Sequence, residues 1–103
     1  NSNQVVFAVV NDEQELIGVI YFNEIRDIIF SDFKVKYTPI NEVMHPPKEI
    51  IYPTDSMETV MDKFEKTKVV FLPVIKNGKY HGFISKSNAL VAYRSMLKSM
   101  TIE

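Results

Sequence analysis

Residues 69–88, with the sequence VVFLPVIKNGKYHGFISKSN, decide the fold. The apolar run Val69–Ile75 predicts a buried strand, and the return run Tyr80–Ile84 predicts its antiparallel partner. Between them, Asn77-Gly78 is typical of a tight hairpin turn, since both residue types accept positive φ. Ser85 or Ser87 can then cap a helix. The apolar face of this helix carries five residues: Ala89, Ala92, Tyr93, Met96 and Met100.

The same pattern occurs earlier, in residues 5–24, as VVFAVVNDEQELIGVIYFNE. Gly18 and Gly82 set an offset of 82 − 18 = 64, at which Phe7 meets Phe71 and Ile20 meets Ile84 without a gap. The chain is therefore a tandem repeat of a strand–turn–strand–helix unit. In the first copy we expect a strand over 5–10 buried on both faces, a returning strand over 16–21 and a helix over 22–30.

The residues between the copies predict further elements. We expect a connector over 31–39, a helical turn over 40–44, an end to it at His45-Pro46-Pro47, and a short extended piece over 48–52. A helix over 55–66 should follow, with Asp55 as its N-cap and Glu58 completing a capping box. Its apolar stripe is Met57, Val60, Met61 and Phe64. We expect residues 101–103 to fray.

These elements predict an α+β fold of tandem β-α-β-β-α units, with small mixed sheets packed on helices. The first unit lacks a counterpart of the 55–66 helix and is incomplete. We therefore expect residues 1–31 to be the second half of a first unit, 32–39 a connector, and 40–103 a complete second unit. Because the chain has no initiator Met and opens almost at once in a strand, we expect it to be a piece of a longer protein.

Composition argues against several function classes. The charges of 12 basic and 13 acidic residues nearly cancel, so the sequence has no basic stripe that would attract the phosphate backbone of a nucleic acid. The absence of cysteine excludes disulfides, thiolate nucleophiles and the commonest zinc frameworks. His45 and His81 lack a second ligand at metal-binding spacing, and no catalytic triad or phosphate-binding loop occurs. We expect neither a metal site nor an enzyme.

The repeat resembles the CBS domain, the cystathionine-β-synthase-type module that normally occurs in tandem pairs. The similarity is carried by Val43-Met44 before a proline loop, by the run Ile51–Met57 into a helix, by Leu72-Pro73-Val74 and by Gly82–Ser85. In addition, residues 16–22 and 34–39 resemble the cytoplasmic tail of bacterial CLC-type chloride channels.

The CBS resemblance implies a regulatory module, and many such modules bind adenine nucleotides such as ATP, ADP and AMP, or S-adenosylmethionine, between their two units. A Gly-x-x-Ser/Thr-x-x-Asp pattern then holds sugar and phosphate, and apolar residues at the start of the first hairpin strand contact the base. The second copy offers Gly82, Ser85 and Asn88, which we call the second motif, with Val69 at the base position. Gly82 and Ser85 fit, but Asn replaces Asp. Gly82-x-x-Ser85 can also be only a strand–helix turn with a serine cap, since a cap alone explains Ser85.

The first copy gives Gly18, Tyr21 and Glu24, which we call the first motif, with Val5 at the base position. Tyr in place of Ser would crowd a ligand, while Glu keeps the carboxylate on a longer arm. Both motifs are therefore degenerate. At Gly18 and Gly82 the sequence leaves two explanations open, close approach of a ligand or tight packing.

The resemblance implies a non-catalytic module that senses a small molecule and modulates an attached membrane channel or transporter, with chloride as the expected ion. It would lie on the cytoplasmic side of the inner membrane. The alternative is a structural dimerisation module without a ligand, which the degenerate motifs favour. In both cases we expect a homodimer, because half a unit leaves strand edges and apolar helix faces uncovered.

Overall fold

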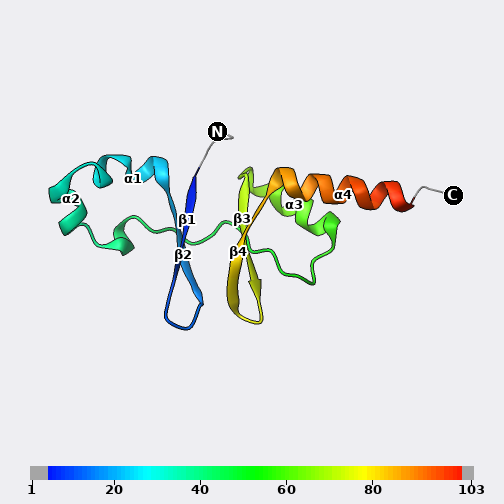
Figure 1. Cartoon of the computed structure of the whole chain (residues 1–103), viewed down its shortest axis with the longest axis horizontal. Helices are drawn as coiled ribbons and strands as arrows, with labels where there is room; N and C mark the ends of the chain where they lie inside the picture. Colours follow the sequence, from blue (N-terminus) through cyan, green and yellow to red (C-terminus); the bar gives the residue numbers. More distant parts are fainter. Residues whose placement is uncertain (1–4, 101–103) are drawn as a thin grey trace. The chain divides into compact units, whose positions relative to one another are not determined.

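The computed structural model describes residues 5–100, so the expected fraying of 101–103 lies outside the described residues. The chain divides into two compact units, Asn1–Pro47 and Lys48–Glu103, which are described one at a time. Each unit contains an antiparallel hairpin that runs directly into a helix (Figure 1). The α+β class and the repeated hairpin–helix plan are therefore confirmed.

The first unit begins with the hairpin of β1 (Val6–Val10) and β2 (Leu16–Tyr21), followed by α1 (Phe22–Ile29). The predicted hairpin and helix are confirmed. The expectation that the first strand is buried on both faces is wrong, because Phe7 is 46% and Val10 37% exposed. The sheet has only two strands here, and no helix in the described part of this unit corresponds to the one predicted over 55–66 in the second copy.

The predicted connector over 31–39 contains a short helix, α2 (Asp32–Tyr37). Ser31 caps it by accepting a hydrogen bond from the Lys34 backbone N–H at 3.3 Å. Phe33, Val35 and Tyr37 alternate with polar residues, a period of two that does not indicate a helix, and all three side chains are exposed. The helix was missed because only its cap carries a helical signal.

After α2, the predicted helical turn is confirmed as a 3₁₀ turn, η1 (Ile40–Glu42). The chain then becomes extended at His45, which forms an antiparallel bridge with Val19 through two backbone hydrogen bonds of 2.8 Å. This bridge covers the outer edge of β2 and explains why the first compact unit extends to Pro47. The predicted limits 1–31, 32–39 and 40–103 follow the sequence repeat and stay a prediction.

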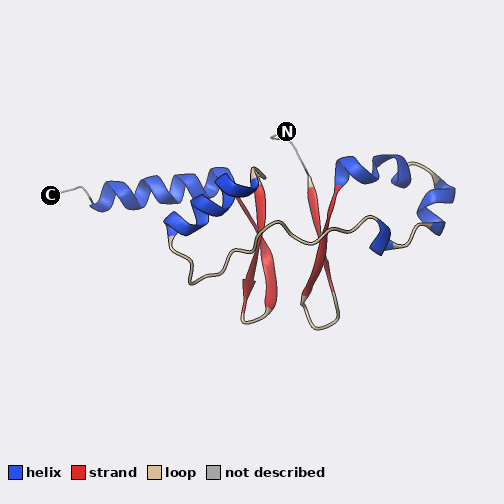
Figure 2. Ribbon diagram, turned by 180° about the vertical axis from the view of Figure 1, so that it is seen from behind, coloured by secondary structure: helices blue, strands red, loops and turns tan. Residues whose placement is uncertain are grey.

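The second unit comprises α3 (Met57–Thr67), β3 (Phe71–Lys76), β4 (Lys79–Ser85) and α4 (Lys86–Met100). Figure 2 shows the β3–β4 hairpin continuing into α4, with α3 beside α4. Asn77 (φ 53°) and Gly78 (φ 78°) form the predicted two-residue turn. The predicted extended piece pairs at one point, where Ile51 forms a parallel bridge with Val74 of β3.

One core cluster holds the second unit together. Val60 and Phe64 of α3 pack with Leu72 of β3 and Ala89 of α4. Phe64 is fully buried, and Leu72 and Ala89 are each 1% exposed. The predicted α3 stripe is thus confirmed in its central residues. The α4 face is buried only at its start, since Met96 is 37% and Met100 69% exposed.

The predicted cap of α3 is wrong by one residue. Ser56, rather than Asp55, accepts a hydrogen bond from the Thr59 backbone N–H at 3.0 Å. The Asp55 carboxylate instead accepts bonds from the Tyr52 backbone N–H and from Lys63. Asp55 is therefore committed to the preceding loop, and the helix begins one residue later than a cap at Asp55 would place it.

The two hairpins pair in registers that differ by one residue. Val9 pairs with Gly18, whereas Pro73, its equivalent in the repeat, pairs with Phe83. In the second hairpin, pairing moves from Pro73–Phe83 to Ile75–Tyr80, so His81 and Gly82 together lie opposite Val74. Gly82 therefore lies in a β-bulge, a feature that is frequent beside binding sites.

Candidate functional site

The second motif lies where β4 ends and α4 begins. Gly82 and Ser85 belong to β4, and Asn88 lies in the first turn of α4. Ser85 is the N-cap residue, since its Oγ accepts a hydrogen bond from the Asn88 backbone N–H at 3.0 Å. The predicted cap by Ser85 is confirmed. The structure thus brings Ser85 and Asn88 into direct contact.

Gly82 has a conformation and a neighbourhood that suit the approach of a ligand. Its φ is +109°, which side-chain-bearing residues rarely adopt. A Cβ atom built on Gly82 would find no atom within 4 Å, so the space beside it is open. Among the described residues, no strand or bridge pairs with the edge of β4 that faces away from β3. Tight packing therefore does not explain this glycine.

The start of α4 is electrostatically suited to an anion. Its first turn contains no acidic residue and begins with Lys86. Backbone N–H groups at a helix N-terminus carry partial positive charge and accept negatively charged ligands. The Lys86 N–H itself donates to the Val70 carbonyl at 2.8 Å, which anchors this turn to the chain before β3. Asn88 and Ser87 are exposed.

Val69, the expected base contact, is 9% exposed and belongs to the core cluster. It lies two residues before β3 rather than inside the strand. Its counterpart Val5 precedes β1 and is 49% exposed. The two expected base contacts thus have different surroundings, because Val69 packs in a core that includes α3, whereas the described part of the first unit has no counterpart of α3.

The first motif is engaged by the chain itself. A Cβ atom built on Gly18 would lie 2.3 Å from Met44 Cγ and 2.9 Å from the His45 carbonyl oxygen. Gly18 is therefore explained by tight packing. Glu24 contacts His45 through its Oε1, 2.5 Å from Nε2, and each side chain is 48% exposed.

Tyr21 occupies the position of the cap serine in the first motif, and its side chain makes no capping hydrogen bond to α1. Its ring lies 5.9 Å from the His45 ring, centroid to centroid. Partial burial raises the pKa of the Tyr21 hydroxyl, and the nearby Glu24 charge raises it further. The hydroxyl therefore stays protonated at neutral pH.

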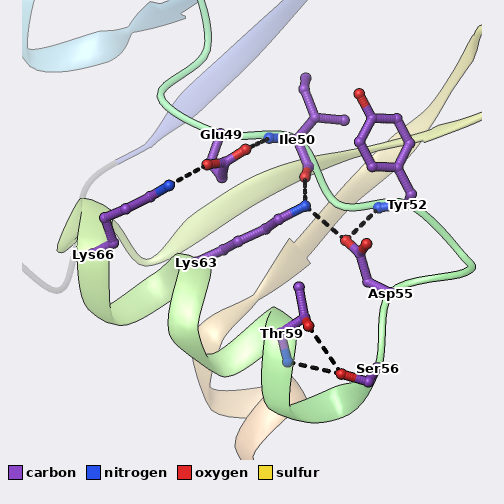
Figure 3. Close-up of polar contacts among 8 residues, drawn as sticks. All are labelled: Glu49, Ile50, Tyr52, Asp55, Ser56, Thr59, Lys63 and Lys66. Carbon is purple, nitrogen blue, oxygen red and sulfur yellow. Dashed lines mark hydrogen bonds and ion pairs between the residues drawn. The ribbon is translucent and has the colours of Figure 1, made fainter.

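A polar cluster in the second unit was not predicted, and Figure 3 shows it. Lys63 of α3 donates to the Ile50 carbonyl at 2.6 Å and to Asp55 Oδ2 at 2.8 Å, and its Nζ lies 5.1 Å from the centre of the Tyr52 ring. One helical turn later, Lys66 contacts Glu49 at 2.6 Å. These contacts fasten the loop from Glu49 to Asp55 onto α3 and hold Ile51 beside β3. Lys63 lies in the middle of α3 on its less apolar face, and nothing in the sequence around it predicts that it binds this loop.

Within residues 5–100 no group of three metal-ligating side chains is placed to hold a metal ion. No helix in the same range is long and apolar enough to cross a membrane.

The sequence profile of the CBS domain matches residues 40–95, more than half of the chain. The chain belongs to the CBS domain family. The uncharacterized protein MJ1004 of Methanocaldococcus jannaschii is 37% identical over 79 residues, which cover 74% of this chain but only 36% of that relative. The solved structure of MJ1004 matches 89% of this chain and 44% of its own, with 28% identity and a TM-score of 0.70.

Two other CBS-like structures contain nucleotides. CbpB in complex with c-di-AMP is 25% identical, with a TM-score of 0.68, and the match covers 93% of this chain and 66% of CbpB. CBSX2 in complex with AMP is 21% identical with the same TM-score, over 88% of this chain and 72% of CBSX2. At that identity the likeness to CBSX2 shows the fold alone.

Proposed function

We propose that this CBS module is regulatory and senses an adenine nucleotide, which it binds through the second motif. The observation that carries the proposal is the pairing of an open, positive-φ glycine, Gly82, with a serine-capped helix start free of acidic residues. The glycine lets a ligand approach the backbone, and the helix start accepts its phosphate. The c-di-AMP bound by CbpB supports this ligand class.

In the proposed mechanism, bound nucleotide favours one arrangement of the module and so shifts the population of states of an attached domain. We propose a membrane channel or transporter as that domain, with chloride as the ion, and the cytoplasmic side of the inner membrane as the location. The support is the resemblance of residues 16–22 and 34–39 to CLC-type tails. A homodimer is the proposed assembly.

The test is a thermal unfolding titration with AMP, ADP, ATP, S-adenosylmethionine and c-di-AMP. A ligand present at 100 times its dissociation constant should stabilise the protein by about 2.7 kcal/mol. The absence of a shift with all five at millimolar concentration would contradict the proposed function and leave the dimerisation module as the better description.

Ser85→Ala and Ser56→Ala form a matched pair for this titration. Each removes one N-cap hydrogen bond of 3.0 Å in the same unit, so each should lower stability by about 1 kcal/mol. Only Ser85 belongs to the proposed site. Ser85→Ala should therefore weaken nucleotide binding while Ser56→Ala preserves it. Equal affinities in the two variants would show that the ligand binds elsewhere.

A further inference from the structure

The tip of the second hairpin has a chemistry that the proposed function does not use. Asn77 is the one asparagine in the sequence that glycine follows. Asn77 and Gly78 form the turn between β3 and β4, with φ of 53° and 78°, and both residues are exposed. We propose that Asn77 is a spontaneous deamidation site, at which water converts the side-chain amide to a carboxylate and ammonia leaves.

The reaction needs only the chain and water. The Gly78 backbone nitrogen gives up its proton and attacks Asn77 Cγ. The bond from Cγ to Nδ2 then breaks, and Nδ2 leaves as ammonia with that proton, so a succinimide ring remains. Water opens the ring at either carbonyl carbon. Cleavage between the nitrogen and Cγ gives aspartate, whereas cleavage between the nitrogen and the main-chain carbonyl carbon gives isoaspartate. No oxidant or reductant takes part.

Gly78 suits this attack. A side chain on the residue after asparagine crowds the approach of its backbone nitrogen to Cγ, and glycine has none. A Cβ atom built on Gly78 would find no atom within 4 Å, so no other part of the described chain crowds the turn. Within residues 5–100, the hydrogen bonds of turns and loops include none from the Gly78 N–H. The nitrogen is therefore available, and water reaches the ring that forms.

Asn11, at the tip of the first hairpin, is a contrast within the same chain. Its Oδ1 accepts hydrogen bonds from the backbone N–H groups of Glu13 and Glu15, each at 2.9 Å. Its Nδ2 donates to the Glu15 carboxylate at 2.9 Å. The amide is thus held on both sides, and the next residue, Asp12, carries a side chain and a negative charge that disfavours a deprotonated nitrogen. We expect Asn11 to persist while Asn77 is converted.

The two products should affect the hairpin in opposite ways. Lys76 and Lys79 are directly paired beside the turn, and like charges opposite each other destabilise a strand pair. Aspartate at position 77 adds the opposite charge between them, and Asp-Gly suits the same turn. Isoaspartate lengthens the main chain of a two-residue turn, which disturbs the register of β3 and β4. Aspartate should therefore preserve or raise stability, and isoaspartate should lower it.

The experiment ages the full chain at mildly alkaline pH and follows it by peptide mapping with mass spectrometry. The mass gain from amide to acid should appear in the peptide that contains Asn77 before it appears at any other asparagine, and in two chromatographically separable forms. Asn77→Gly keeps a turn sequence of the same type, Gly-Gly, and removes the reacting amide. Its urea unfolding curve should not change on ageing, whereas the wild-type curve should broaden toward lower urea. Earlier conversion at Asn11, or none at Asn77, would overturn the proposal.

A second measurement tests the effect of the aspartate product. Freshly purified Asn77→Asp should have a urea midpoint equal to or above that of the wild type at low salt, because the new charge lies between Lys76 and Lys79. Added salt should reduce any advantage, since it screens exposed charges. A lower midpoint for Asn77→Asp at low salt would overturn the opposite effects expected of the two products.

Discussion

At the residue scale, the Asp55–Lys63 ion pair of the second unit has a structural role and lies outside the second motif. Both side chains are mostly buried, 15% and 16% exposed. Partial burial acts to raise the pKa of Asp55, but hydrogen bonds from Lys63 and the Tyr52 N–H, together with the Lys63 charge, outweigh it and lower the pKa. The pair is a structural fastening of the 49–55 loop.

We expect Asp55→Asn to lower the free energy of unfolding by about 1–2 kcal/mol at pH 7, because the Lys63 charge loses its partner. The pKa of Asp55 is lower in the folded state, so its contribution is present in full above the ordinary value of about 4 and is lost as pH falls below that value through the lower pKa of the folded state. Urea unfolding at pH 7 and pH 3 should therefore show the difference between wild type and variant shrinking in acid.

Glu65→Gln is the matched control for this prediction. Glu65 contacts Lys68 at 2.6 Å, and the contact lowers the pKa of Glu65, yet the pair is 69% and 72% exposed. Solvent screens such a pair, so its loss should change stability much less than Asp55→Asn. Equal losses in the two variants would contradict a special role for the buried pair.

Gly18 and Gly82 should respond differently to alanine. Gly82→Ala should cost about 1–2 kcal/mol, because φ +109° strains any residue with a Cβ even in open space. Gly18→Ala forces Cβ against Met44 and the His45 carbonyl. Adding Met44→Ala should recover part of the Gly18→Ala loss in urea unfolding and none of the Gly82→Ala loss. Recovery in both backgrounds would show that Met44→Ala acts nonspecifically.

Asn88 is the position at which the second motif departs from the family pattern. Asn88→Asp restores a carboxylate, whose two oxygens can grip the adjacent ribose hydroxyls of AMP. We expect tighter AMP binding by calorimetry. In c-di-AMP one of these two hydroxyls is esterified, so the gain should be smaller for that ligand. An equal gain for both ligands would indicate a general effect at the helix start rather than a grip on the sugar.

At the scale of elements, the sequence predicted both hairpins and the helices after them, because long apolar runs and the Asn77-Gly78 turn are strong local signals. Contacts distant in sequence were not predictable. Asp is a favourable N-cap residue, but the Asp55 carboxylate accepts a hydrogen bond from Lys63, eight residues later. Ser56 therefore caps α3 in its place. Likewise the sequence placed Gly18 and Glu24 at a ligand site without revealing that residues 44 and 45 contact them.

The helix cap offers a prediction at this scale. Ser56→Ala should lower the free energy of unfolding by about 1 kcal/mol, since the Thr59 N–H loses its partner. Glu58→Gln should leave stability nearly unchanged, because the predicted capping box with Asp55 does not form. Chemical denaturation of both variants decides between the two descriptions. A larger loss of stability in Glu58→Gln than in Ser56→Ala would support the predicted capping box.

At the scale of the molecule, exposed apolar side chains lead us to expect self-association. Among the described residues, Phe30 is 79%, Phe33 71% and Tyr37 62% exposed in the first unit, and Val91 is 65% and Met100 69% exposed in the second. Apolar surface of this kind is usually covered by a partner.

We therefore expect a homodimer in sedimentation velocity, and its association should strengthen or stay constant as salt rises, because apolar contacts are not screened. Dissociation by moderate salt would point to charge pairing instead. A monomer at high protein concentration would contradict self-association altogether.

The one-residue difference in register has a consequence for the duplication itself. Phe7 and Phe71 coincide in the repeat, yet Phe7 pairs with Ile20 whereas Phe71 pairs with Ser85, one step beyond the equivalent of Ile20. A shift of one residue turns a strand's side chains to the opposite face. A recombinant that joined the first strand of one copy to the return strand of the other would have to slip its pairing or expose its apolar face. The strands of the two hairpins are therefore not interchangeable, although their sequences align without a gap.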